Sequence, residues 1–149
     1  MSVRRKCEGE LPRRAFLGVC AAVAAAPVFA ACASVLVRQV PAINGRVELP
    51  LAQYPELTEA GTALQILPNG ETQPLIVLVG PDGKHTVLSS ECTHRACTVE
   101  VQGERIVCPC HGSTYDRKGD VLRGPAERPL RRYRAQLTGE GILVIDLAT

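Results

Sequence analysis

The sequence of 149 residues contains no tryptophan, two phenylalanines and three tyrosines. Proteins that bind single-stranded nucleic acid stack bases on aromatic side chains and attract phosphates with an excess of positive charge. This chain offers few rings for stacking, and its formal net charge is only +2. Its composition therefore argues against a nucleic-acid partner.

Beyond the N-terminal region, the sequence also lacks segments with the apolar period of a helix. Short apolar, partly β-branched runs occur instead, in pairs separated by turn residues. The pairs are 75–79 with 85–89, 99–101 with 105–108, and 133–137 with 142–147. We predict a single all-β domain over residues 47–149, mostly antiparallel and long enough to bury a core without staples.

Residues 1–37 are typical of an export signal. Arg13-Arg14 precedes Phe16-Leu17, and residues 15–37 then carry no charge. A basic segment with an arginine pair ahead of a modest apolar stretch indicates twin-arginine export, which carries folded cargo. An ordinary secretory signal that holds two arginines is the alternative.

The fate of this apolar run has three alternatives. It is long enough to remain as a membrane-anchoring helix, which needs about 20 residues. The stretch Phe29-Ala30-Ala31-Cys32 resembles a lipoprotein cleavage site, which would make Cys32 the lipidated first residue. Simple cleavage after Ala30 or Ala31 is the third alternative. We expect membrane attachment at the periplasmic face of a bacterial inner membrane, with 38–46 as a polar linker.

Four of the seven cysteines share one short span with two of the three histidines. The stretches C-T-H-R-A-C (92–97) and C-P-C-H-G-S (108–113) each follow a predicted strand. The hairpin between them would bring its two ends together, so the two stretches are expected to face each other. Thiolate and imidazole groups are ligands for soft and borderline metals.

Three kinds of site fit these residues. A structural zinc ion takes two cysteines and two histidines. An exported protein can instead form two disulfides. A [2Fe–2S] cluster with mixed ligands takes two cysteines on one iron and two histidines on the other. Zinc leaves two cysteines without a role, and disulfides alone leave both histidines without one.

The two stretches resemble the cluster-binding loops of the Rieske iron–sulfur proteins of quinol-oxidising cytochrome bc-type complexes. The resemblance also covers Tyr115 and Gly124-Pro125-Ala126, which is similar to the family's proline loop. It implies an antiparallel Rieske-type β-sandwich with a cluster-binding subdomain of two loops, and one [2Fe–2S] cluster per chain. The implied ligands are Cys92, His94, Cys108 and His111.

The resemblance assigns further residues. Cys97 and Cys110 would form a disulfide between the loops, and Ser113 and Tyr115 would donate hydrogen bonds to cluster sulfurs. His111 would be the catalytic ligand, facing quinol and accepting its proton. The implied function is electron transfer from quinol to a c-type cytochrome, within a membrane complex that contains cytochromes of b and c type.

Three alternatives to this function remain. They are a Rieske subunit of another periplasmic oxidoreductase, such as the arsenite-oxidase type, a free electron shuttle, and the structural zinc module. A cytoplasmic Rieske ferredoxin usually lacks the second cysteine pair.

Two positions depart from the family pattern. Arg95-Ala96 replaces the usual Leu-Gly, and Glu127 stands where a second proline is frequent. These differences leave the cluster residues intact and bear on the partner. Five arginines, at 123, 128, 131, 132 and 134, are interpreted as a solvated surface or as a docking face for an acidic partner. His85 is expected to face solvent from a strand.

Overall fold

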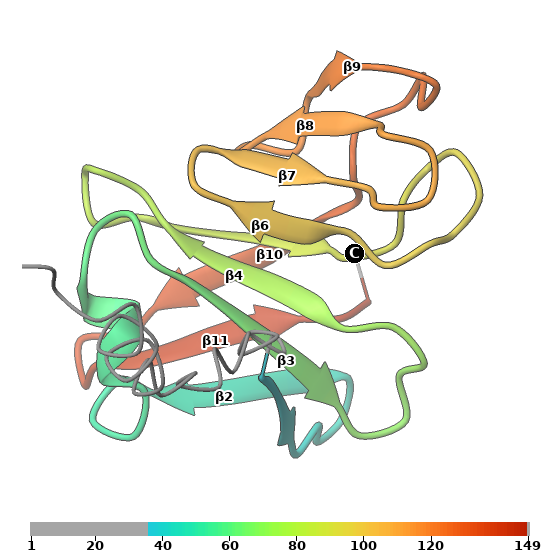
Figure 1. Cartoon of the computed structure of the whole chain (residues 1–149). Helices are drawn as coiled ribbons and strands as arrows, with labels where there is room; N and C mark the ends of the chain where they lie inside the picture. Colours follow the sequence, from blue (N-terminus) through green and yellow to red (C-terminus); the bar gives the residue numbers. More distant parts are fainter. Residues whose placement is uncertain (1–35, 149) are drawn as a thin grey trace, which may run out of the picture. The chain divides into compact units, whose positions relative to one another are not determined.

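The computed structural model describes residues 36–148, which form two sheets (Figure 1). The large sheet has the order β1-β3-β4-β5-β10-β11-β2. In that order its strands are Val37–Val40, Ala63–Pro68, Leu75–Val79, His85–Ser89, Arg132–Leu137, Ile142–Asp146 and Arg46–Pro50. The small sheet runs β6-β7-β8-β9, which are Glu100–Gln102, Arg105–Val107, Thr114–Asp116 and Val121–Arg123. The one helical turn in the described part is the 3₁₀ helix η1 (Pro55–Thr58).

The all-β prediction is confirmed, and the three predicted hairpins are β4–β5, β6–β7 and β10–β11. Every strand pair among the described residues is antiparallel except β1 with β3. Residues 1–35 lie outside the described residues, and with them the predicted twin-arginine signal, the possible anchor and the possible lipidation site at Cys32. Between residues 36 and 148, we find no helix with the length and apolar character needed to cross a membrane.

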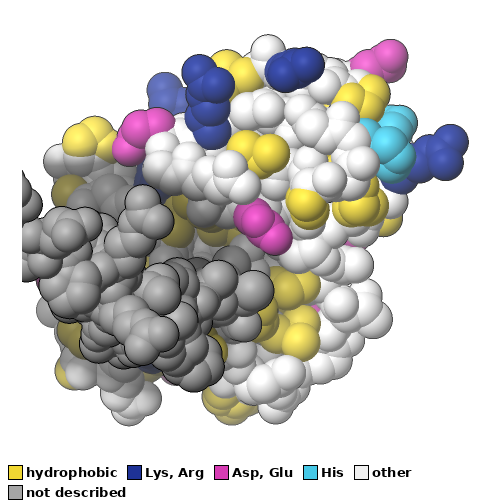
Figure 2. Space-filling model, in the orientation of Figure 1, with side chains coloured by type: hydrophobic (Ala, Val, Ile, Leu, Met, Phe, Trp, Pro, Cys, Tyr) yellow, Lys and Arg dark blue, Asp and Glu magenta, His cyan; other side chains and the backbone are white. Residues whose placement is uncertain are grey.

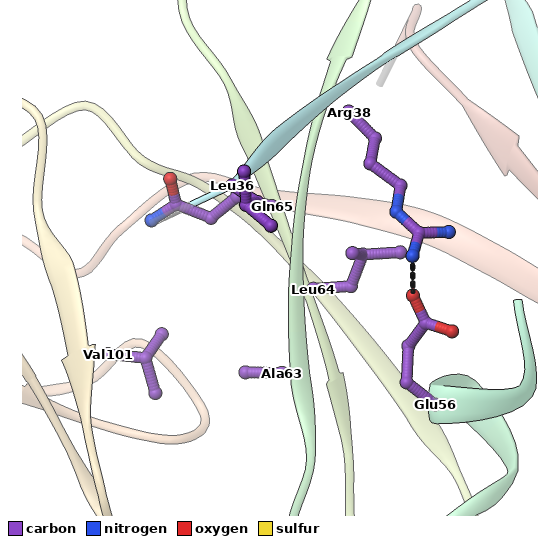
Figure 3. A pocket seen from close by; sticks show the side chains of 7 residues that line it. All are labelled: Leu36, Arg38, Glu56, Ala63, Leu64, Gln65 and Val101. Carbon is purple, nitrogen blue, oxygen red and sulfur yellow. Dashed lines mark ion pairs between the residues drawn. The ribbon is translucent and has the colours of Figure 1, made fainter. Parts of the chain in front are cut away.

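The predicted linker over 38–46 needs correction, because it contains most of β1. Val40 is 1% exposed and packs in the core, so its burial holds this segment in the sheet. Arg38 Nη2 also lies 3.0 Å from Glu56 Oε1 at the rim of a hollow of about 340 Å³ between β1, β3 and β6 (Figure 3). The ordered domain therefore begins before residue 47.

The sequence of strand β4, Leu-Ile-Val-Leu-Val, is apolar at every position because both faces of the strand are buried. Side chains alternate between the two faces of a strand, and all five residues of β4 are buried. Leu75, Val77 and Val79 pack in one apolar core, while Ile76 and Leu78 pack in another. The strand thus separates two cores, which is why its apolar residues do not alternate with polar ones.

The first core lies inside the large sheet. Strands from both ends of that sheet contribute to it, so the sheet folds over itself as the two layers of a sandwich. Its fully buried members include Val47, Leu49, Ile66, Leu143 and Ile145.

The second core joins the outer face of the large sheet to the small sheet. Leu88 from the large sheet packs with Ile106 and Tyr115 from the small one. Cys92 and Cys108 belong to the same cluster of buried residues. The small sheet therefore sits on a continuous apolar base, and the first cysteine of each loop is fixed at the edge of that base.

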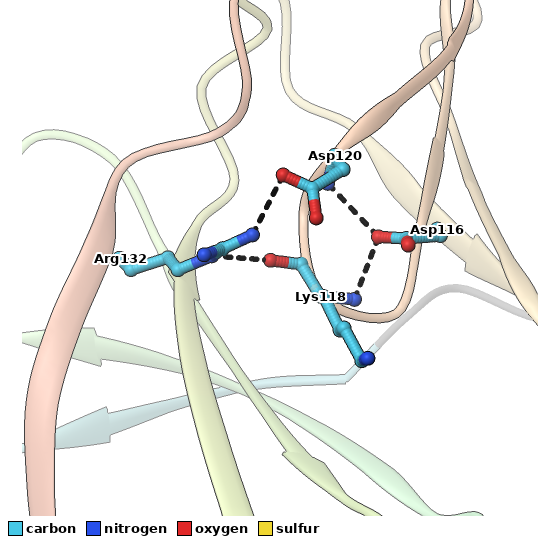
Figure 4. Close-up of polar contacts among 4 residues, drawn as sticks. All are labelled: Asp116, Lys118, Asp120 and Arg132. Carbon is cyan, nitrogen blue, oxygen red and sulfur yellow. Dashed lines mark hydrogen bonds and ion pairs between the residues drawn. The ribbon is translucent and has the colours of Figure 1, made fainter.

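Two arginines add polar contacts between the sheets. Arg117 donates hydrogen bonds from Nη1 to the carbonyl of Gly103, at 3.0 Å, and from Nη2 to those of Gly61 and Thr62, at 3.0 and 2.8 Å. Arg132 Nε donates to the Lys118 carbonyl at 2.6 Å (Figure 4). Gly103 belongs to the β6–β7 turn and Gly61 precedes β3, so one guanidinium connects the two sheets.

The turn between β8 and β9 is closed by its own side chains (Figure 4). Asp116 Oδ1 accepts hydrogen bonds from the backbone N–H groups of Lys118 and Asp120, at 2.8 and 2.9 Å. Gly119 has φ +87°, and a Cβ there would meet Leu88 Cδ2 at 3.0 Å. The turn therefore needs glycine both for its backbone conformation and for its close approach to β5.

Candidate metal centre

Loop 1 (residues 90–97) follows β5 and loop 2 (residues 108–113) joins β7 to β8, and the two have the same backbone hydrogen bonds. In loop 1 the Cys92 N–H donates to the Cys97 carbonyl, and the Ala96 N–H donates to the Cys92 carbonyl, both at 2.8 Å. In loop 2 the Cys108 N–H donates to the Ser113 carbonyl at 2.8 Å, and the Gly112 N–H to the Cys108 carbonyl at 3.0 Å. Each loop is thus a closed turn with a cysteine at its base and a histidine near its tip.

The equivalence extends to the fifth residue of each turn. Gly112 has φ +76° and Ala96 has φ +56°, both in the left-handed region. Glycine adopts this conformation without penalty, whereas alanine has a Cβ that disfavours it. Loop 1 therefore keeps the shape of loop 2 although its residue at this position is less suited to it.

A disulfide between Cys97 and Cys110 joins the loops. The Sγ atoms of both residues lie within 4.8 Å of the Sγ atom of Cys108. A disulfide sulfur is not a thiolate, so of these three residues only Cys108 is available to bind a metal. Cys92 and Cys108 are the free cysteines of the described part, and both are buried.

The two loop histidines lie edge to face, with ring centroids 4.8 Å apart. His94 is half-buried, and its Nδ1 atom is buried without any hydrogen-bond partner. A buried polar atom without a partner destabilises a fold by about 1–3 kcal/mol, so such atoms are rare unless a ligand satisfies them. His111 is exposed.

The two free thiols differ in their electrostatics. Burial raises the pKa of the Cys108 thiol, and the neighbouring Cys92 thiol contributes to the rise. Burial also acts to raise the pKa of Cys92, but hydrogen bonds from Tyr115, the His94 backbone, Cys108 and Ser113 together lower it below its ordinary value. The pocket thus already contains donors that stabilise a sulfur anion at Cys92.

Tyr115 is the main donor. Its hydroxyl lies 3.3 Å from Cys92 Sγ and 3.1 Å from Thr93 Oγ1, and it accepts a hydrogen bond from the Thr93 N–H at 3.2 Å. Thr93 Oγ1 in turn donates to the Arg128 carbonyl at 2.6 Å. Because the Thr93 proton is used there, its oxygen is left to accept, and the Tyr115 proton is shared between Thr93 and Cys92.

A third segment, residues 124–128, completes the surroundings. It begins with a cis peptide bond between Gly124 and Pro125, and Ala126 is buried. The Ala126 N–H donates to Ser113 Oγ at 3.0 Å. The Ser113 hydroxyl proton therefore remains free to point elsewhere, and Ser113 contributes to lowering the pKa of Cys92.

These residues fit a mixed sulfur–nitrogen metal centre. Cys92, Cys108, His94 and His111 come from two loops tied together by a disulfide, and the unpartnered His94 Nδ1 has the chemistry of an imidazole ligand. Two disulfides do not form, because Cys92 and Cys108 stay free. The contacts of Thr93 with Tyr115 and Arg128 were not anticipated from the sequence, since nothing local to Thr93 indicates residues so far along the chain.

The remaining histidine differs from expectation, whereas the arginine set agrees with it in exposure. His85 is not simply solvent-facing: it is half-buried, and its Nε2 lies 2.9 Å from the Leu57 carbonyl. The five arginines are all exposed, in agreement with the interpretation as a solvated surface, but some of them have specific partners. Arg132 pairs with Asp120 at 2.7 Å, and Arg131 lies over the Tyr133 ring at 4.7 Å. Arg123 precedes the segment of residues 124–128 that contacts the loops, and Arg128 ends it.

Comparison with known proteins identifies this arrangement. The family model of the Rieske [2Fe–2S] domain matches residues 48–134. The cytochrome b6-f complex iron-sulfur subunit of Chlorobaculum thiosulfatiphilum is 35% identical over 71 residues, which are 46% of this chain and 39% of that protein. The cytochrome b6-f complex iron-sulfur subunit 2 of Nostoc sp. is 32% identical over 100 residues, 64% of this chain and 55% of that protein. The chain thus matches between 39% and 55% of the length of these relatives.

Among solved structures, the chain resembles the quaternary ammonium Rieske monooxygenase CntA in complex with L-carnitine. The TM-score is 0.54 at 15% identity, covering 62% of this chain and 30% of that one. At this identity the likeness concerns the fold alone.

Proposed function

Because the chain belongs to the family of Rieske [2Fe–2S] domains, we propose that it transfers single electrons between quinol and a c-type cytochrome in a membrane complex. Its cofactor is a [2Fe–2S] cluster. The proposed ligands are Cys92 and Cys108 for one iron and His94 and His111 for the other. When bound, such a cluster supplies a one-electron acceptor whose histidine ligation raises its potential above that of an all-cysteine cluster.

The observation that carries this proposal is the exposure gradient across the ligand residues. Cys92 and Cys108 are 2% and 1% exposed, His94 is half-buried, and His111 is exposed. A partner can therefore reach the centre at His111 without opening the fold. An imidazole at that position can form a hydrogen bond with a quinol hydroxyl and hold its proton, which suits a substrate that loses electrons and protons together.

The buried residues have a complementary role. Ser113 and Tyr115 are both fully buried, so they keep water from the sulfur side of the site. Their hydroxyl groups donate toward sulfur, and donors of this kind favour the more negative, reduced state of a metal centre. The hydroxyl groups on the cysteine side therefore raise the potential further, while the histidine side meets the partner.

Relatives named as cytochrome b6-f complex subunits support the proposed membrane complex. The proposed location is the periplasmic face of a bacterial inner membrane, after twin-arginine export of the folded, cofactor-loaded protein. The alternatives are a subunit of another periplasmic oxidoreductase, of the arsenite-oxidase type, and a free shuttle.

Quinol reduction of the purified holoprotein tests this proposal. We expect two irons and two acid-labile sulfides per chain, bleaching of the visible spectrum when a short-chain quinol is added, and a midpoint potential that is flat in acid and falls as the pH rises. The fall reflects proton loss from the imidazole side of the site, which favours the oxidised state. A potential independent of pH up to strongly alkaline solution would contradict the proton-accepting role, and zinc without iron would contradict the cofactor.

Replacing Tyr115 by phenylalanine should lower the midpoint potential. The change removes a single hydroxyl that lies 3.3 Å from Cys92 Sγ and leaves the buried ring in place. Losing one donor to a sulfur anion is worth about 1 kcal/mol, which for one electron corresponds to about 40 mV. Redox titration of the purified variant measures the shift, with Tyr54→Phe as the matched control because Tyr54 packs against the first core, which contains no residue of either loop. Equal potentials for native and Tyr115→Phe protein would refute the role of this hydroxyl.

A further inference from the structure

We propose that the electron acceptor of this protein has an acidic docking surface. Arg95 and Arg128 would contact that surface beside the two histidines. The inference rests on the proposed electron-transfer function and specifies the chemistry of its protein partner.

Arg95 and Arg128 both line a hollow next to loop 1, and we call them the rim arginines. This hollow has a volume of about 490 Å³, and its lining includes His94, Arg95 and Arg128. The His94 ring in the lining contacts the exposed His111 ring, so His111 lies directly beside the lining of the hollow. Figure 2 shows histidine side chains next to Lys or Arg side chains at one edge of the molecule. A partner seated over this hollow would come close to both histidines.

The positive charge at this rim is not neutralised within the described part of the chain. Arg95 and Arg128 are exposed, and neither guanidinium forms an ion pair or hydrogen bond with a described residue. Arg117 and Arg132, in contrast, bind backbone carbonyls. The two rim arginines thus make no polar contact that stabilises the described part of the chain. Their charge is available to attract an approaching partner.

Two acidic residues share the hollow with the arginines. Glu71 and Glu91 line the same hollow, and both act to raise the pKa of Tyr133, against the effect of Arg131 and after the larger effect of burial. Arg95, Arg128 and Arg131 line it as well, so three arginines face two glutamates there. Outside the hollow, the exposed Glu127 lies beside Arg128, the exposed Glu100 pairs with Val107 below loop 2, and the exposed Arg123 ends β9. The excess of positive charge is therefore confined to the hollow, where Arg95 and Arg128 lie.

This charge distribution favours an acidic protein over an apolar binding pocket. Inserting the tip of loop 1 into a dry cavity would remove the Arg95 guanidinium from water without a counter-charge, which is costly. An acidic surface would replace that water with carboxylates, which raises the association rate and orients the partner. The arginine at this loop tip therefore fits a carboxylate-rich partner.

Electron transfer to two protein probes tests the inference. Reduced holoprotein is mixed in a stopped-flow instrument with either of two c-type cytochromes of similar potential, one with an acidic and one with a basic surface. At low ionic strength we expect the acidic probe to react faster and its rate constant to fall as salt is added. Arg95→Gln and Arg128→Gln should each slow the acidic probe by about three- to five-fold, the effect of one charge at about 5 Å in water, and should not slow the basic probe.

Two matched variants control for the charge change itself. Arg105→Gln removes an exposed arginine at the start of β7, outside the hollow, and should change both rates less than the two rim variants do. Glu127→Gln should speed the acidic probe. Binding of the acidic cytochrome to the oxidised holoprotein, measured by calorimetry, gives a second readout without electron transfer and should weaken in the same two arginine variants.

The outcomes separate this inference from the proposed function. Loss of the cluster spectrum, or no electron transfer to either probe, would refute the function itself. Equal rates with both probes, or rates that Arg95→Gln and Arg128→Gln leave unchanged while the spectrum is intact, would overturn the acidic partner alone. A matching slowing of quinol oxidation in these variants, with the protein probes unaffected, would assign the surface to quinol and equally overturn it.

Discussion

Replacing His94 by alanine should leave a folded, colourless protein. The variant lacks one of four proposed ligands, and iron content is expected to fall at least about tenfold, because the remaining groups cannot complete the coordination of the second iron. Iron and acid-labile sulfide analysis, together with the visible spectrum, measures the loss.

In the metal-free protein, the same substitution should not reduce stability. There the buried Nδ1 atom of His94 has no partner. Removing it eliminates a polar group whose burial costs about 1–3 kcal/mol, so the apoprotein should be no less stable to denaturant with alanine at this position. A histidine kept for its packing would instead show the same loss of stability with and without metal.

His85→Ala is the matched control for the loss of the cluster. It removes the third histidine, whose ring lies against the Leu57 carbonyl, away from both loops. We expect full iron and sulfide content in this variant. Loss of iron in His85→Ala equal to that in His94→Ala would show that the assay reports general destabilisation and would remove the support for His94 as a ligand.

Removing the disulfide should have the largest effect on stability. Cys97 and Cys110 are 13 residues apart, and a closed loop of that length contributes about 3 kcal/mol to the free energy of unfolding in the chain-entropy model. The double variant Cys97→Ala with Cys110→Ala should lose this amount, and denaturant unfolding of the apoprotein measures it. Because the disulfide joins the two loops, we also expect the variant to release its cluster more readily than native protein does.

Chemical reduction of the native protein provides the control for this change. Reduced native apoprotein should unfold at the same denaturant concentration as the double variant, because both have lost the same covalent link. An unchanged unfolding midpoint after complete reduction would show that the disulfide does not constrain the unfolded chain. In that case its contribution would have to be sought in the geometry of the loops.

The metal centre could be predicted from the sequence because the cysteines and histidine of each loop lie close together along the chain. Each loop follows a strand and carries its cysteines and histidine at fixed spacing, and the hairpin between them brings the loops together. The three hairpins were predicted for the same reason, since turn residues separate their strands.

The missed features depend on contacts between distant segments. The parallel pairing of β1 with β3 joins residues whose own sequence reads as a polar linker, and it depends on burial of Val40 beneath other strands. Arg117 and Thr93 contact carbonyl groups far along the chain, and no periodic pattern indicates which carbonyls a side chain will reach. Half-burial of His85 likewise follows from where η1 packs, which its own strand does not specify.

The hydrogen bonds of Arg117 to Gly61 and Thr62, together with the shared apolar base, fasten the small sheet and its loops to the large sheet. We therefore expect that the tips of loops 1 and 2 do not swing between two partners while the large sheet stays in place. If the protein serves a donor and an acceptor at different places, the entire body formed by both sheets has to travel between them, as one rigid shuttle.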